Sequence, residues 1–198
     1  EITELFARPE PRRRLVEFFV FQLAFSMLMG GGFTLFLQHL FPEYFGPELR
    51  SSAKHIGLVF LFTFVEGLAI SPILYVYGRT SPGVIGQAGM LTASAFGILT
   101  LYAFVSRRDF SAWGAFFTVG LWVLIATSLL NLFFQNQTAS LWLAGATVLV
   151  FSGLLVFDTW RLRNVFGPED YVQAAVTIYL DLLNMFLAIL QLLGGRRE

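Results

Sequence analysis

The sequence predicts an all-α integral membrane protein, because its composition is strongly apolar and its apolar segments have the length of membrane spans. Of 198 residues, 56% are hydrophobic and 13% are charged, whereas an average soluble domain has about 45–50% and about 25%. The charged residues gather in short segments between long apolar stretches. Since a bilayer core needs about 20 mainly apolar helical residues, these stretches are predicted to be transmembrane helices.

Six apolar segments reach or approach the length of a membrane span. Their apolar runs are continuous, which favours helices over the alternating strands of a barrel. Short loops join the segments without a linker, so residues 1–198 are predicted to form a single transmembrane helical domain. The predicted segments are Leu15–Phe41, Ile56–Tyr77, Pro82–Val105, Ala112–Phe134, Ala139–Phe157 and Tyr171–Leu193.

The positions of the basic residues conflict with six simple crossings. Cytoplasmic loops are rich in Lys and Arg, and the first, third and fifth loops carry most of these residues. The cluster Arg12–Arg14 should lie on the same side as Arg50, yet a single segment separates the two. Either this first segment, interrupted at Gly30–Gly32, does not cross simply, or one span is absent from the chain.

Small residues in the third segment predict a helix–helix contact. Gly89, Ala93 and Gly97 lie four residues apart on one helical face, a pattern that permits close approach of two helices. Gly86 and Ser94 broaden the same surface.

Other classes of function find little support in the composition and motifs. The net charge is zero, so no nucleic-acid partner is expected, and the lack of cysteine excludes disulfides and thiolate chemistry. His39 and His55 are too isolated to predict a zinc site, and no nucleotide-binding glycine motif occurs. No nucleophile–base set is visible either, so we expect a protein that is not an enzyme and has no cofactor.

Asp181 is the acidic residue with the clearest functional signal. It lies in the middle of the last apolar segment, where a charge costs at least about 2.5–3.5 kcal/mol. Steps of three and four residues from Asp181 trace a stripe of small and polar side chains, which must face protein or water rather than lipid. The stripe consists of Ala174, Thr177, Asp181, Asn184, Ala188 and Gln191.

Two more acids, Asp158 and Glu66, are candidates on neighbouring segments. Asp158 follows the fifth apolar run, where it is either a headgroup-level acid beside Trp160 and Arg161 or, if the helix continues to about Val165, a deeper partner of Asp181. Two carboxyl groups meeting there would share a proton and titrate as a pair. Glu66 lies within the second segment, where it suits either an ion or proton path or a structural hydrogen bond.

These residues resemble the signature of the Bax inhibitor (transmembrane Bax-inhibitor-motif) family, and the short termini and compact loops are typical of a bacterial member. The resemblance rests on Phe157-Asp158-Thr159 and on residues 176–186, and residues 64–73 resemble the third span of the family. It covers roughly residues 56–195 and implies a seven-helix bundle with the last helix central. Because only one apolar segment precedes the family's third span, we expect that a span is missing around or after that segment.

The resemblance also implies a function, a pH-sensitive calcium leak. Asp158 and Asp181 would be the proton-sensing pair that gates it and possible ligands of Ca²⁺, the transported ion. Glu66, Thr177 and Asn184 would lie along the ion pathway. The expected partners are the lipid bilayer, Ca²⁺ and protons, and the expected location is a bacterial plasma membrane. The alternative is a membrane regulator that binds a membrane-anchored ATP-dependent protease or another membrane partner.

Overall fold

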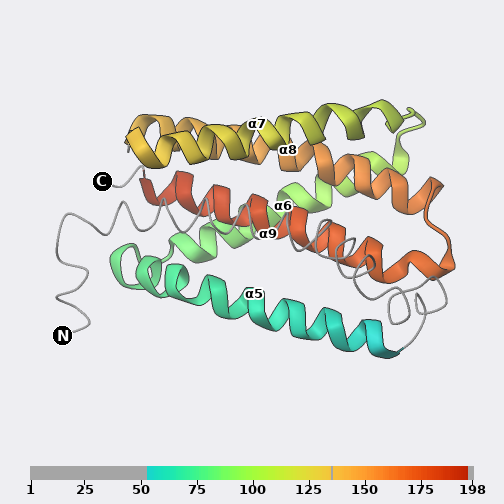
Figure 1. Cartoon of the computed structure of the whole chain (residues 1–198), viewed down its shortest axis with the longest axis horizontal. Coiled ribbons are helices and arrows are strands. Elements are labelled where there is room, and N and C mark those ends of the chain that lie inside the picture. The colour runs from blue at the N-terminus through green and yellow to red at the C-terminus, as the bar shows by residue number, and fades with distance from the viewer. Residues whose placement is uncertain (1–52, 135, 196–198) are drawn as a thin grey trace.

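The computed structural model of the chain describes residues 53–134 and 136–195, and Figure 1 shows them as a bundle of long helices. Five α-helices and one short 3-10 helix make up this described part. Their bounds are α5 Ala53–Thr80, α6 Val84–Val105, α7 Ser111–Phe134, α8 Gln137–Asn164, η3 Pro168–Asp170 and α9 Tyr171–Gly195. The segment Leu15–Phe41, with the arginine cluster before it, lies outside the described residues.

The helical class predicted from the sequence is confirmed in the described residues. Four helices are long and apolar enough to cross a membrane, namely α6, α8, α9 and, over Ser111–Asn131, α7. Helix α5 covers the predicted segment Ile56–Tyr77, and its crossing of the membrane stays a prediction. The seven-helix count also stays a prediction, because it depends on residues before Ala53.

Local signals in the sequence explain where several helices begin. Gly83 precedes α6 with a φ of 88°, a left-handed conformation that glycine adopts without a steric penalty. Asn136 caps α8, since its side chain accepts a hydrogen bond from the Ala139 amide at 3.1 Å. Pro168 opens η3, and Asp170 accepts from the Gly167 amide at 3.0 Å, so the turn before α9 is preorganised.

Helix α8 continues well beyond the apolar run that ends at Phe157. It extends to Asn164, one residue short of Val165, where the longer of the two predicted helices would end. This longer helix was the one expected to carry Asp158 inward. Arg161 and Arg163 lie in its last turn, where positive charge complements the negative end of the helix dipole. Arg163 also donates to the carbonyl oxygens of Phe104 at 2.6 Å and Ser106 at 3.3 Å, which fastens the end of α6 to α8.

The last helix is central in the described bundle, as predicted. Helix α9 packs against α5, α6 and α8, and Figure 1 shows it between α5 and the α7–α8 pair. Met185 and Leu190 of α9 are fully buried, as is Leu155 of α8. Burial of these apolar side chains favours association of the helices around α9.

The predicted contact face on α6 is wrong in the described part of the chain. Ala93 and Gly97 are exposed, and a methyl group added at Gly89 or Gly97 would meet no atom within 4 Å. The buried face of α6 instead carries Val84, Ala88, Thr92 and Ala103. Its first three members also lie four residues apart, so the sequence offers two faces with this spacing and cannot tell which one meets a neighbour.

Close helix approach depends instead on Gly153 of α8. A Cβ atom at this position would overlap the ring of Phe117 on α7. That ring makes edge-to-face contacts with Trp113 and Phe116, at centroid distances of 5.6 Å and 5.1 Å, which restrict its movement. A larger residue at position 153 would therefore have to displace the Phe117 ring.

Replacing Gly153 with alanine is expected to lower the thermal stability of the purified protein, because the new methyl group must displace the Phe117 ring. Overpacking of this kind costs about 1–3 kcal/mol. Gly97→Ala is the matched control, since this helical glycine has open space around it and alanine favours a helix. Thermal melting in detergent measures both variants, and equal melting temperatures would contradict the α7–α8 packing.

Candidate functional site

The carboxyl groups of Asp158 and Asp181 meet at the interface of α8 and α9. Each residue is only 4% exposed, and the two side chains lie within hydrogen-bonding reach of one another. The predicted adjacency of the two aspartates is therefore confirmed. Such a pair avoids the repulsion of two buried anions when the groups hold one proton between them.

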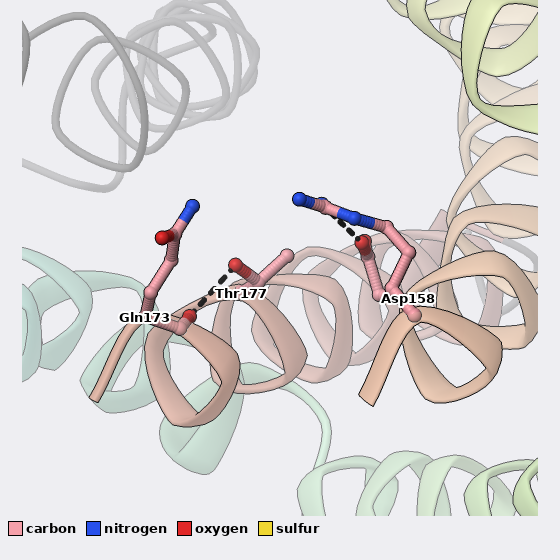
Figure 2. A network of polar contacts seen from close by, with 4 residues as sticks. Asp158, Gln173 and Thr177 are labelled. Carbon is pink, nitrogen blue, oxygen red and sulfur yellow. Dashed lines mark hydrogen bonds and ion pairs between the residues drawn. The ribbon is translucent and has the colours of Figure 1, made fainter. Parts of the chain in front are cut away.

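Asp158 also forms an ion pair within its own helix. Arg161 Nη1 donates to Asp158 Oδ1 at 3.0 Å, and Figure 2 shows Asp158 with this contact as a dashed line. The guanidinium lies over the rings of Phe166, at 4.6 Å from the centroid, and Phe157, at 5.5 Å. Sequence reasoning placed Asp158 either near Arg161 or near Asp181, and the structure places it beside both.

Among the described residues, no cation pairs with Asp181 in this way. Its Oδ2 is buried and forms no hydrogen bond to any described residue. Buried polar atoms are nearly always hydrogen-bonded, so an unpaired carboxylate oxygen at this depth is unusual. The two members of the pair therefore differ: Asp158 is held by an arginine, and Asp181 has an oxygen free to take a proton, a water molecule or a cation.

The polar stripe on α9 faces the interior of the bundle, as predicted. Ala174, Asp181, Asn184 and Ala188 are buried, and Thr177 and Gln191 are partly buried. Asn184 donates to the Leu180 carbonyl at 2.9 Å. Thr177 donates to the Gln173 carbonyl at 2.8 Å, a contact drawn in Figure 2. Both donors are used within α9, which leaves the Asn184 carbonyl and the Thr177 lone pairs as possible ligand groups.

Glu66 lies at a different interface of the same helix. It is 0% exposed on α5 and acts electrostatically on Tyr179 of α9, while Asp158 acts on Asp181. Phe62, one turn before Glu66, contacts the Tyr179 ring edge to face at 6.3 Å. The structure thus places a buried acid on each of two neighbours of α9, Asp158 on α8 and Glu66 on α5. Tyr179 was missed from the sequence, because only the packing of α5 against α9 brings it within electrostatic range of Glu66.

The carboxyl pair alone is a sparse metal site. Among the described residues, no cluster of three or more His, Cys, Asp or Glu side chains could hold a metal ion. Calcium takes six to eight oxygen ligands, so Asp158 and Asp181 would need carbonyl, hydroxyl or water oxygens to complete its shell. Ca²⁺ ligation by this pair therefore stays a prediction.

Fold and site together define a class: a helical membrane protein with a buried carboxyl pair between its last two helices. Comparison with protein families extends this result, since the profile described as "Inhibitor of apoptosis-promoting Bax1" matches residues 11–198. The chain therefore belongs to the Bax inhibitor family.

Individual relatives come from a virus, from eukaryotes and from bacteria. The Golgi anti-apoptotic protein of vaccinia virus (strain Lister) is 43% identical over 132 residues, which cover 67% of this chain and 54% of the relative. Protein lifeguard 4 of mouse is 38% identical over 139 residues, covering 70% and 57%. Bax inhibitor 1 of Schizosaccharomyces pombe is 38% identical over 145 residues, covering 73% and 53%. The chain thus spans about half the length of these curated relatives.

Cross-linking tests the carboxyl pair without reference to function. The chain has no cysteine, so a double variant Asp158→Cys, Asp181→Cys carries the only two thiols. A short bifunctional thiol reagent is expected to join them within one molecule, which mass spectrometry of a protease digest detects. The control pairs Asp158→Cys with Ala175→Cys, an exposed position on α9, and is expected to stay unlinked. Equal linking in both would contradict the described interface.

Proposed function

We propose that this Bax inhibitor family protein is a calcium leak of the membrane, gated by pH through Asp158 and Asp181. The observation that carries the proposal is the contact of two buried carboxyl groups across the α8–α9 interface. Acidic side chains inside membrane segments are rare and mark ion or proton pathways. The family membership, with its anti-apoptotic relatives, supports a function in the membrane but does not name the ion.

The proton is the proposed switch between closed and open forms. With one proton shared, one carboxyl group donates a hydrogen bond to the other and holds α8 and α9 together. When that proton leaves, two negative charges face each other in an apolar interface, and their repulsion favours separation of the helices. Their oxygen atoms are then free to interact with a divalent cation, for which carboxylates are suitable hard ligands.

Oxygen atoms on α9 and α5 would continue the ion pathway. Asn184 follows Asp181 by one turn and is buried, and Thr177 precedes it by about one turn on the same stripe. Glu66 is the acid of the α5 side. These groups supply carbonyl, hydroxyl and carboxylate oxygens, the ligand types that Ca²⁺ accepts. The assignment of all three to the pathway is part of the proposal.

A location in a bacterial inner membrane belongs to the same proposal. A membrane protein of Vibrio cholerae supports it, with 36% identity over 151 residues that cover 75% of this chain and 67% of the relative. The alternative function, a regulator bound to a membrane-anchored protease or another membrane protein, has no specific contact in its favour. Absence of calcium flux in liposomes would favour this alternative.

Calcium flux into liposomes that contain the purified protein is expected to change with pH, and Asp181→Asn is expected to flatten this dependence. Asparagine keeps the volume and a hydrogen bond but cannot exchange a proton. We expect at least about half of the pH response to be lost, because Asp158, the remaining carboxyl group, no longer titrates as one of a coupled pair. The part that remains would come from Asp158 with Arg161 beside it. Asp109→Asn, in the exposed loop between α6 and α7, is the matched control and is expected to keep the wild-type profile.

Two results would count against the proposal. Identical pH profiles for wild type and Asp181→Asn, with both proteins monodisperse, would remove the carboxyl pair from the gate. Absence of calcium flux at every pH would remove the leak itself, and co-purification from membranes would then test the binding-partner function.

A further inference from the structure

Arg161 is paired with Asp158, one of the two acids that the proposed leak offers to a transported cation. Its guanidinium lies 3.0 Å from Asp158 Oδ1, and the two side chains are 28% and 5% exposed. We propose that Arg161 acts as a tethered cation that competes with Ca²⁺ for Asp158 and so limits entry of the ion to the carboxyl pair. This inference rests on the proposed function, because it takes Ca²⁺ as the transported ion.

The arrangement of Arg161 suits a displaceable partner. Asp158 is buried, whereas Arg161 lies in the last turn of α8, and 28% of its side chain is exposed. The rings of Phe157 and Phe166 lie against the guanidinium and hold it by cation–π contact when it is beside Asp158. Because more than a quarter of its side chain is accessible, the Arg161 guanidinium can leave Asp158 and be hydrated without crossing the bundle.

The second arginine of this turn cannot replace the first. Arg163 points to the end of α6, where it donates to the carbonyl oxygens of Phe104 and Ser106. Asp181, on the facing helix, is the other charged group that acts on Asp158. Arg161 is therefore the cation assigned to this pair in the described residues, and its loss would remove the one cation that these residues place beside the Asp158 carboxylate.

Mutual exclusion of the two cations follows from their size and charge. Calcium binds carboxylate oxygens at about 2.3–2.6 Å, which leaves no room for a guanidinium on the same oxygen and places two positive groups in contact. A Ca²⁺ ion at Asp158 therefore requires Arg161 to leave. The arginine would set the apparent affinity of the site and would disfavour monovalent ions, whose single charge competes less well with it.

Calcium binding and calcium flux test this inference separately. Binding of radiolabelled Ca²⁺ to the purified full chain, and flux into liposomes, are measured at one mildly alkaline pH, where competition from protons is lowest. The variants are Arg161→Gln, Arg161→Lys and, as the charge-matched control, Arg107→Gln in the exposed α6–α7 loop. We expect Arg161→Gln to bind Ca²⁺ about three- to tenfold more tightly and to leak faster, as loss of one charge-assisted hydrogen bond predicts.

The lysine and loop variants separate competition from a change of structure. Arg161→Lys keeps the tethered charge and is expected to stay within about twofold of wild type, the size of a small difference in binding free energy, and Arg107→Gln is expected to match wild type. Equal Ca²⁺ affinity of Arg161→Gln and wild type, or the same gain in Arg107→Gln, would overturn the inference even if pH-dependent flux is present. Tighter binding by Arg161→Gln without flux in any variant would support the inference and overturn the proposed leak.

Discussion

The contact of Asp158 with Asp181 is the constraint on which the rest of the described structure depends. Two carboxyl groups in an apolar interface are stable only if they share a proton, gain a counter-charge or bind a cation. The extended end of α8 carries Asp158 into the bundle and places Arg161 beside it. The inward polar stripe of α9 keeps Asp181 and Asn184 away from lipid, and the central place of α9 follows from that requirement.

Helix α9 carries two groups that interact with buried acids on different helices. Asp181 lies beside Asp158 of α8, while Tyr179 packs against Phe62 of α5 and is acted on electrostatically by Glu66. In an α-helix, positions two residues apart lie on nearly opposite faces. A shift of α9 away from α8 would therefore also disturb its contact with α5. In the proposed leak, the acid on α5 would respond to the state of the carboxyl pair through movement of α9, without touching the pair.

The sequence alone predicted the elements whose signals are local. The apolar lengths placed five helices, and steps of three and four residues around Asp181 identified the buried face of α9. The position of Asp158 in the bundle depended on where α8 ends. The apolar run that ends at Phe157 did not predict this end, because Arg161 and Arg163 extend the helix by stabilising its last turn. The contact face of α6 was missed, since Val84–Ala88–Thr92 and Gly89–Ala93–Gly97 share one spacing. The Phe62–Tyr179 contact and the bond of Arg163 to α6 join residues far apart in the chain, which no local pattern reveals.

Separation of α8 and α9 on loss of the shared proton is the central claim, and a distance measurement tests it most directly. Because the chain has no cysteine, spin labels can be attached at Asn164→Cys and Ala175→Cys, exposed positions near the adjoining ends of the two helices. Pulsed electron resonance in liposomes then gives the distance between the labels at acid and alkaline pH. The account predicts a longer distance at alkaline pH and a constant distance when Asp181→Asn is added. A distance that stays the same across pH in the labelled protein with both aspartates intact would contradict it.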